Sequence, residues 1–203
     1  MDNFIKRSFD FIVSLISLVL LIPFFFIIAI VIRLDSTGPV FFRQVRIGQY
    51  GIPFHIHKFR TMIVDAEIKG LQVTVRKDPR ITRVGNFLRQ YKLDELPQLF
   101  DVFIGKMSLV GPRPEVPKYI VNYSPEIRDI VFSVKPGITD NASILYYSEN
   151  DLLTMSNNPE KVYLEEILPK KLQSYVDYVK HQTFWGDIEI ILKTLMLLIK
   201  KRK

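Results

Sequence analysis

The sequence predicts a helix-rich α+β fold in which an apolar N-terminal helix precedes one compact domain. Three observations lead to this prediction. The 203 residues suit a single domain with a small appendage. Residues 11–32 form an apolar run without a charge. Behind this run, one β-hairpin pattern is followed by helical spacing of apolar residues towards the C-terminus.

Composition and charge limit the classes of function. Cysteine is absent, which excludes disulfides, thiolate metal sites and a cysteine nucleophile. With three histidines, a dedicated transition-metal site is also disfavoured. The net charge of +7 is concentrated in two patches, since residues 76–92 carry six basic side chains against one acidic one and the last four residues are all basic. Each patch suits an anionic partner such as a phosphate, a lipid headgroup or a nucleic acid.

The apolar run is long enough to cross a bilayer. As a straight helix, its 22 residues would measure about 33 Å. No small-residue cleavage site follows it, which disfavours a cleavable signal peptide. Pro23 lies at its centre and predicts a kink, because proline removes a helix hydrogen bond. The residues alone fit either a kinked transmembrane anchor or a re-entrant helix with both ends on one face, and the basic residues at both ends mildly favour the second.

Residues 38–60 predict a β-hairpin. Aromatic and β-branched residues dominate 40–46 and 54–59, and residues 48–51 (GQYG) supply the turn. His55 and His57 share one strand face, so they are either two metal ligands or part of a polar surface. Since no third ligand is near in the sequence, the polar surface is the favoured interpretation.

Three helices are expected after the hairpin. Helical spacing predicts the first two over 63–70 and 83–91, with irregular polar residues between them. The third is predicted from Asp94 to Gly105, because apolar residues recur there at positions i, i+3, i+4 and i+7. Pro97 is tolerated only in the first turn of that helix.

The C-terminal half predicts two rigid turns and two helices. Residues 111–114 (GPRP) must be extended, because a residue before proline is driven out of the α region. Residues 136–139 (PGIT) give a second turn signal. Helix is expected again over 159–179, and residues 187–203 predict an interfacial helix with a basic end.

The adjacent carboxylates Asp94 and Glu95 are the main candidates for chemistry, since GxGxxG, GxxxxGK[ST], GxSxG and HExxH motifs are all absent. A helix N-terminus favours a bound phosphate. There an aspartate can attack phosphorus as a nucleophile, and a neighbouring carboxylate can hold Mg²⁺. The alternative is structural, because Asp and Glu are common at helix starts for stability alone.

Three basic residues are candidates to accompany this pair. Arg113 is fixed between two prolines and suits bidentate phosphate binding, although such loops also serve only to shape a surface. Lys58 and Arg60 lie at the end of the second predicted strand. They are either phosphate ligands or solvated charges at a strand end.

Taken together, these segments resemble one family, the bacterial sugar transferases, which are small monotopic phosphoglycosyl transferases. The resemblance covers nearly the whole chain and is specific because the segments keep their order and spacing. It is densest over 93–102 (LDELPQLFDV) and 107–114 (MSLVGPRP). The other matching segments are the apolar run with its central proline and residues 35–44, 58–62, 135–139 and 178–180.

The resemblance implies transfer of a phosphosugar from a UDP-sugar to a membrane polyprenyl (undecaprenyl) phosphate with release of UMP, the first membrane step of surface glycan or glycoconjugate assembly. It implies that Asp94 forms a covalent phosphosugar–aspartyl intermediate and that Glu95 binds Mg²⁺. Arg89 matches an arginine that suits the lipid phosphate. The residues expected to bind substrate are Arg89, Arg113, Lys58 and Arg60.

The resemblance also favours the re-entrant geometry. Residues 1–36 would form the re-entrant helix and its flanks, and residues 37–203 a catalytic domain with interfacial amphipathic helices at the cytoplasmic face of the bacterial inner membrane. The expected partners are the UDP-sugar donor, the polyprenyl phosphate acceptor and anionic membrane lipid, and a homo-oligomer is compatible with the sequence. No nucleic-acid-binding motif occurs, so nucleic acid is not expected. The minimal form of the family is expected, without the additional N-terminal membrane helices of larger members.

Two departures from the family pattern bear on these expectations. Ile22 precedes Pro23 where many members have serine, which weakens the expectation of re-entrant geometry. Residues 140–143 (DNAS) replace the usual Gly-Trp or Gly-Leu-Trp, so no donor sugar is carried over. Two other classes stay open: a membrane glycosyltransferase that releases UDP, and a non-enzymatic, membrane-anchored basic binding protein.

Overall fold

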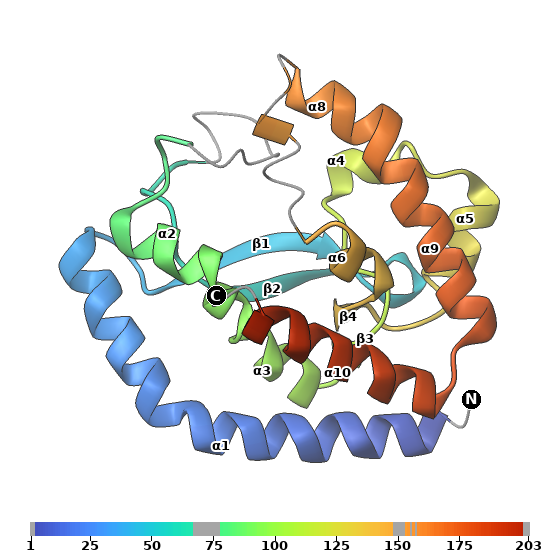
Figure 1. The fold of residues 1–203 in the computed structure, drawn as a ribbon, viewed down its shortest axis with the longest axis horizontal. Helices are drawn as coiled ribbons and strands as arrows, with labels where there is room; N and C mark the ends of the chain where they lie inside the picture. The colour runs from blue at the N-terminus through green and yellow to red at the C-terminus, as the bar shows by residue number, and fades with distance from the viewer. Residues whose placement is uncertain (1–2, 67–77, 148–152, 155, 157, 201–203) are drawn as a thin grey trace.

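The computed structural model describes residues 3–66, 78–147, 153–154, 156 and 158–200. It confirms a helix-rich α+β fold with a long apolar N-terminal helix and a small antiparallel hairpin (Figure 1). The elements are α1 (Asn3–Asp35), β1 (Phe41–Ile47), η1 (Gln49–Gly51), β2 (Pro53–Phe59), α2 (Arg83–Gln90), η2 (Leu93–Glu95), α3 (Gln98–Phe103), β3 (Ser108–Val110), α4 (Pro117–Ile120), α5 (Pro125–Val131), β4 (Gly137–Thr139), α6 (Asn141–Leu145), α8 (Pro159–Val162), η3 (Tyr163–Ile167), α9 (Leu168–His181) and α10 (Phe184–Lys200).

Helix α1 continues through Pro23 as one element and bends along its length, first running beneath the domain and then rising beside α2 (Figure 1). By length and composition it could cross a membrane, and it is the one described helix that meets this test. Apolar side chains cover its outer face, whereas Asp10 and Ser14 on its inner face are buried. The outer face therefore suits lipid, and the inner face is occupied by the domain.

Polar contacts fix the first half of α1 to the domain. Arg7 donates to the carbonyls of Val102 and Phe103 at the end of α3, each at 2.7 Å. Asp10 accepts a hydrogen bond from the Ser108 hydroxyl at 2.7 Å and one from the backbone N–H of Leu109. Because buried polar groups lose stability unless they are paired, these contacts define one docked position for the helix.

The hairpin is confirmed, with Phe41 opposite Phe59 and Ile47 opposite Pro53. His57 ties it to α3, because its backbone N–H and its ring Nδ1 both bond the Asp101 carboxylate, at 2.9 and 2.7 Å. This favours the structural interpretation of His57 over the metal-ligand one.

Around the carboxylate pair, the prediction of one helix from Asp94 to Gly105 is wrong. Residues 93–95 form a separate 3₁₀ turn, and α3 begins only after Pro97. The break has a local cause, since Lys92 adopts a left-handed conformation with φ of 56° and Pro97 has no N–H to bond the preceding turn. Helix α2 is confirmed.

The predicted helix over 63–70 is not supported where it can be checked. Residues 64–66 form a turn, in which Asp65 is left-handed with φ of 63°. The remainder of that predicted helix, residues 67–70, lies outside the described residues.

The prediction of a turn at 136–139 is also wrong, because Gly137–Thr139 is a strand. β4 pairs in parallel with β3, with Ser108 opposite Gly137 and Val110 opposite Thr139. A Cβ atom at Gly137 would lie 2.1 Å from the backbone nitrogen of Gly111, so only glycine permits this approach. The pairing holds the extended GPRP segment beside β4, and Gly137 donates to the Pro112 carbonyl at 3.0 Å.

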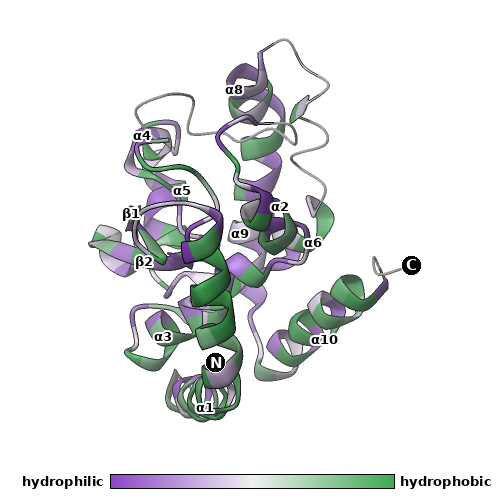
Figure 2. Cartoon of the chain, turned by 90° about the vertical axis from the view of Figure 1, so that its left-hand side faces the viewer, coloured by the Kyte–Doolittle hydropathy of each residue, from purple (hydrophilic) through white to green (hydrophobic). Residues whose placement is uncertain are grey.

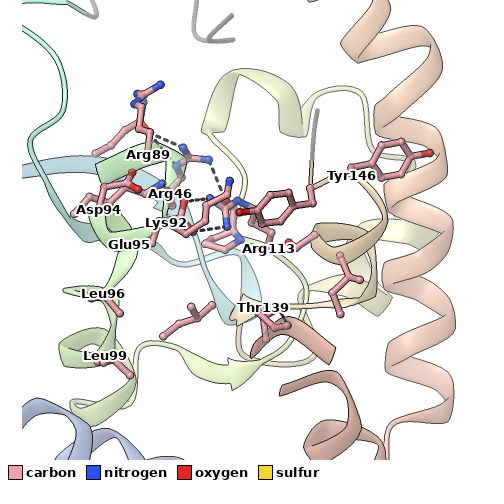
Figure 3. A pocket seen from close by; sticks show the side chains of 18 of the residues that line it. Arg46, Arg89, Lys92, Asp94, Glu95, Leu96, Leu99, Arg113, Thr139 and Tyr146 are labelled. Carbon is pink, nitrogen blue, oxygen red and sulfur yellow. Dashed lines mark hydrogen bonds and ion pairs between the residues drawn. The ribbon is translucent and has the colours of Figure 1, made fainter. Parts of the chain in front are cut away.

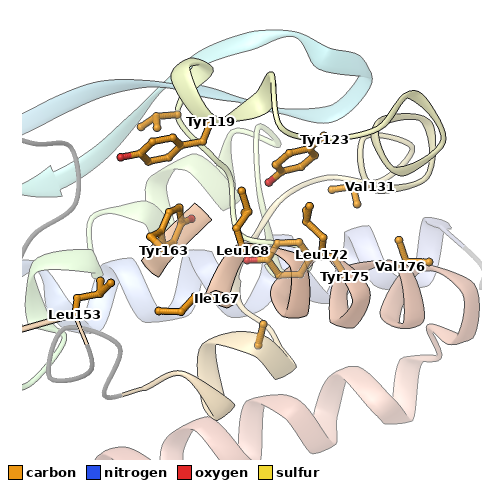
Figure 4. Packing of buried hydrophobic residues seen from close by; sticks show 12 residues of the cluster. Tyr119, Tyr123, Val131, Leu153, Tyr163, Ile167, Leu168, Leu172, Tyr175 and Val176 are labelled. Atoms are coloured by element: carbon orange, nitrogen blue, oxygen red, sulfur yellow. The ribbon is translucent and has the colours of Figure 1, made fainter. Parts of the chain in front are cut away.

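The helix predicted over 159–179 is confirmed as α8, η3 and α9, of which η3 is π-helical. Tyr163 and Ile167 of η3 are buried in the largest apolar cluster, between α9 and the α4–α5 segment (Figure 4). Helix α10 follows at the edge of the domain, where it contacts α6, β3 and β4 (Figure 2). The basic end predicted for it falls mostly on residues 201–203, outside the described part of the chain.

Candidate active site

Asp94 and Glu95 lie in the 3₁₀ turn between α2 and α3, where the left-handed Lys92 redirects the chain. Asp94 is 7% exposed, and its Oδ1 is buried without a hydrogen-bond partner among the described residues. The sequence predicted that the pair lies at an α-helix N-terminus, and this prediction is wrong. Its environment is set by the basic side chains around it.

Glu95 is held by two cations. Lys58 of β2 contacts its Oε1 at 2.8 Å, and Arg113 of the GPRP loop grips both carboxylate oxygens, with Nη1 3.1 Å from Oε2 and Nη2 bonded to Oε1. Burial alone would raise the pKa of Glu95, but the charges of Arg113 and Lys58 outweigh it and hold this pKa well below its usual range. Glu95 is therefore ionised and neutralised by its neighbours.

Asp94 has the opposite environment. Burial, together with the charge of Glu95, raises the pKa of Asp94 above its usual value, although Lys58, Arg89 and Lys92 act against the rise. Its carboxylate is thus poorly stabilised as an anion, which is a property of groups poised to react.

The cations are also perturbed. Burial, aided by the charge of Arg113, lowers the pKa of Lys58 to about 8 despite the attraction of Glu95. Arg89 of α2 donates through Nε to the Thr61 hydroxyl at 2.8 Å, which fixes its guanidinium on the Asp94 side of the site. Lys92 stacks over the ring of Tyr147, 5.5 Å from its centroid.

Of the predicted residues, the structure brings together Lys58, Arg89, Asp94, Glu95 and Arg113, which all line one cavity. It does not bring Arg60 with them. The guanidinium of Arg60 donates to the carbonyls of Ser36 and Thr37, at 2.6 and 2.8 Å, and fixes the segment after α1. Its contacts indicate a structural role.

Sequence reasoning missed Arg46, which lines the same cavity. Its guanidinium donates to the Pro114 carbonyl at 3.0 Å and to Gln44 at 2.7 Å, and lies 3.6 Å from Glu115. A signal existed, because the hairpin register pairs Arg46 with Phe54 and so sets it on the same face as Lys58.

The cavity has a volume of about 630 Å³ and is amphipathic. Around the carboxylates it is strongly basic, since seven basic and three acidic side chains line it. Figure 3 shows the charged groups gathered at one level of the cavity, with Leu96, Leu99 and Thr139 at another and Tyr146 across from Asp94. The tyrosines that line it are Tyr119, Tyr146, Tyr147, Tyr163 and Tyr175.

The other end of the cavity is apolar and lies between α1 and α10. It begins at Leu96 and Leu99 beside the carboxylates. Its remaining walls are Phe9, Val13 and Ser17 of α1, Leu109, Ile138 and Ile144 of the domain, and Ile191, Thr194, Leu195, Leu197 and Leu198 of α10. One continuous space therefore joins a polyanion-binding region to a hydrocarbon-lined region.

The carboxylate pair also fits a magnesium ion. Among the described residues no cluster of three or more metal-ligating side chains occurs. Mg²⁺ commonly binds through one or two carboxylates, with substrate phosphates and water completing its shell. Two adjacent carboxylates, one with an unpartnered buried oxygen, match that donor set.

Comparisons with known proteins identify the family of the chain. Residues 1–201 match the family described as bacterial sugar transferase. The chain is 36% identical over 197 residues to the UDP-glucose:undecaprenyl-phosphate glucose-1-phosphate transferase of Escherichia coli, covering 96% of this chain and 40% of the relative. It is 34% identical to the UDP-N-acetylgalactosamine-undecaprenyl-phosphate N-acetylgalactosaminephosphotransferase of Aeromonas hydrophila, covering 97% and 44%. A UDP-glucose:undecaprenyl-phosphate glucose-1-phosphate transferase of Caulobacter vibrioides is 34% identical, covering 96% and 69%. The chain thus spans about two fifths of the length of several of these relatives.

Proposed function

The chain belongs to the bacterial sugar transferase family, and we propose that it transfers a phosphosugar from a UDP-sugar to undecaprenyl phosphate and releases UMP. This reaction would initiate assembly of a surface glycan or glycoconjugate. The observation that carries the proposal is the amphipathic cavity, in which a buried carboxylate pair ringed by cations opens onto an apolar channel. The cations would bind the diphosphate of the donor and the phosphate of the acceptor, and the apolar channel would take the lipid chain of the acceptor.

In the first half-reaction, Asp94 is the nucleophile. Its Oδ1 attacks the phosphorus that carries the sugar, the bond from that phosphorus to the oxygen shared with UMP breaks, and UMP leaves with the bonding electrons. A phosphosugar–aspartyl ester remains. The buried Oδ1 without a hydrogen-bond partner and the raised pKa of Asp94 both support this role, because its anion is not stabilised by solvent.

In the second half-reaction, an oxygen of undecaprenyl phosphate attacks the same phosphorus. The bond between that phosphorus and Asp94 breaks, the carboxylate is regenerated, and a polyprenyl diphosphate sugar forms. Arg89 supports this step from the Asp94 side, and Arg113, Lys58 and Arg46 offset charge on the transferring group.

Mg²⁺ is part of the proposal, with Glu95 as its protein ligand and the free oxygen of Asp94 beside it; bound there, the ion would neutralise charge on the diphosphate. Glu95 now bonds Lys58 and Arg113 through both oxygens. Binding an ion would therefore free donors of these two cations for the phosphates.

The proposed location is the cytoplasmic face of the inner membrane, with α1 re-entrant and α10 interfacial. Two observations support it. Lys6, Arg7 and Asp10 near the start of α1 bind the domain, and Asp35 at its end accepts a hydrogen bond from the Val84 N–H of α2 at 3.0 Å, so both ends of the helix contact the domain. The apolar end of the cavity lies between the two helices, at the level where a lipid chain would enter.

The test is UMP release in detergent from a panel of UDP-sugars, with and without undecaprenyl phosphate, for wild type and Asp94→Asn. We expect lipid-dependent UMP release that is lost in the variant. UDP as the nucleotide product would overturn the phosphosugar mechanism in favour of another glycosyltransferase. Membrane binding with no nucleotide release from any donor would favour a non-enzymatic basic protein.

A further inference from the structure

Helix α10 is attached to the protein in an unusual way. It is largely apolar, yet only Asp187 and Ile190 among its described residues are buried. Leu192, Leu195, Met196 and Ile199 are more than half exposed. Its apolar packing is limited to Ile190 and Ile191 in a core cluster and to Phe184, whose ring meets that of Phe9 of α1 edge to face, so burial of apolar side chains contributes less here than is usual for a helix.

Polar contacts supply much of the attachment. At its start, the Asp187 carboxylate lies 2.5 Å from Lys6 Nζ of α1 and accepts from the Tyr178 hydroxyl of α9 at 2.8 Å. The side chains of Lys6 and Asp187 are 15% and 5% exposed, so this ion pair is shielded from water. Midway along α10, Thr194 and Thr139 of β4 share a hydrogen bond of 2.7 Å.

The same cluster reaches the active site. Lys6 Nζ donates to the carbonyl of Val110 at 2.9 Å, and the Tyr178 hydroxyl that bonds Asp187 lies 3.2 Å from the same carbonyl oxygen. Val110 ends β3 and directly precedes the GPRP loop that carries Arg113. One buried cluster therefore joins α1, α9 and α10 to the end of β3, directly before the GPRP loop.

A directional anchor has a consequence that apolar packing would not have. If burial of apolar area held α10, the helix would move towards α1 until Leu195 and Leu198 met Val13, and the apolar end of the cavity would close. Hydrogen bonds and an ion pair fix distance and direction, so they can keep two apolar walls apart. Figure 2 shows the ribbon of α10 set off from that of α1, and residues of both helices line the cavity.

We propose that Lys6, Tyr178 and Asp187 are positioning residues that hold α10 beside α1, so that the gap between the helices stays open as the channel for the isoprenoid chain of the acceptor. This inference rests on the proposed function, because the occupant of the channel is the lipid part of that acceptor. The assignment rests on the continuity of the cavity. Arg89 and Asp94 at its charged end and Ile191 and Leu198 at its apolar end line the same space.

The kinetic test separates the two half-reactions. Asp187→Asn keeps the size of the side chain but removes the charge that Lys6 requires. We expect the KM for undecaprenyl phosphate to rise about tenfold. The UMP burst with donor alone should stay within about twofold, and so should the KM for a short acceptor such as geranyl phosphate, which does not reach the channel.

Two further variants keep the test decisive. Glu189→Gln is the matched control, because Glu189 is on the same helix but is 65% exposed and pairs with Lys193 one turn away; it should leave every parameter unchanged. Tyr178→Phe removes one hydrogen bond to Asp187 and should raise the long-acceptor KM about threefold. An equal loss of the burst and of both acceptor reactions would show a general structural role and overturn the proposal.

A second measurement does not depend on activity. Since the chain has no cysteine, Ile16→Cys on α1 and Met196→Cys on α10, both at exposed positions, can carry spin labels. In nanodiscs of phosphatidylglycerol, electron–electron resonance should give one narrow distance distribution with the native Asp187, and a broad or shifted one in Asp187→Asn. An unchanged distribution would overturn the proposal, whereas failure of the wild type to release UMP would count against the proposed function alone.

Discussion

At its charged end the cavity is lined mainly by polar side chains on elements that pack through apolar clusters, whereas at its apolar end it is lined mainly by apolar side chains on helices that also make buried polar contacts. Lys58 faces the cavity from a strand whose neighbouring residues Ile56 and Phe59 are buried in apolar clusters. Val13 and Leu198 face the cavity from helices that are also anchored by buried polar contacts, such as Lys6 with Asp187. The groups that meet a ligand and the groups that hold the wall can thus be altered separately.

The same lesson applies within the charged end, where two adjacent carboxylates differ. Lys58 and Arg113 lower the pKa of Glu95 despite its burial, whereas burial and the charge of Glu95 raise the pKa of Asp94 against the opposing cations. Stability and reactivity are therefore divided between neighbours, and the predictions below test that division and then the contrast between the two ends.

The largest effect is expected for Asp94→Asn. UMP release should fall at least about 10⁴-fold, because the nucleophile is lost. The melting temperature should stay equal or rise, because a carboxylate whose folded pKa exceeds its unfolded value destabilises the fold at neutral pH. Thermal unfolding and UMP assays on one preparation check both. A marked fall in melting temperature would mean that the carboxylate is structural.

Glu95→Gln should lower both the stability of the fold and the activity with the donor. The free energy of unfolding should fall by about 3–5 kcal/mol, because Lys58 and Arg113 are left buried without their counter-ion. The donor kcat/KM should fall about 10²- to 10³-fold. Denaturant unfolding and initial rates measure these changes. If Glu95→Gln were as stable as Asp94→Asn, the contrast between the two carboxylates would be wrong.

Leu198→Gln tests the apolar end. An amide in the hydrocarbon-lined channel should raise the KM for undecaprenyl phosphate about tenfold and leave the donor burst unchanged. Leu192→Gln is the matched control, because Leu192 is on α10 but does not line the cavity. Equal effects of the two substitutions would point to membrane attachment of the helix and not to a channel.

The smallest effect concerns pH. Lys58, with a pKa of about 8, loses its charge above that value, so the donor kcat/KM should decline several-fold between pH 7.5 and 9. In Lys58→Arg this decline should move to higher pH. The effect on stability has the opposite direction. Between pH about 8 and 10.5 the unfolded chain keeps a proton on Lys58 that the folded chain has lost, so the contribution of Lys58 to the free energy of unfolding rises with pH there. A flat profile up to pH 9.5 would contradict the lowered pKa.

Local patterns predicted much of the fold, and long-range contacts explain what they missed. The hairpin and α2 follow from residue periodicity and are confirmed. β4 was mistaken for a turn because its parallel pairing needs Gly111 and Gly137 to meet across intervening helices, which no local signal reports. The helix expected from Asp94 was divided because the left-handed Lys92 and Pro97 act together.

The site followed the same rule. Lys58, Asp94, Glu95 and Arg113 could be chosen by chemistry and motif, and they meet in one cavity. Arg60 shares the parity of Lys58 in the sequence, but β2 ends at Phe59, so its side chain turns to the segment after α1. Strand alternation is a guide only within the strand.

The polar contacts of α1 also have a consequence for how the chain folds during synthesis. A ribosome makes α1 first, but Arg7 finds its carbonyls 95 and 96 positions later, and the ion partner of Lys6 is 181 positions away. During most of synthesis the helix therefore carries charges whose partners do not yet exist. Its full set of contacts waits for α10 to emerge, so a chain halted before Asp187 would leave Lys6 without its ion partner, although Arg7 and Asp10 could already be paired.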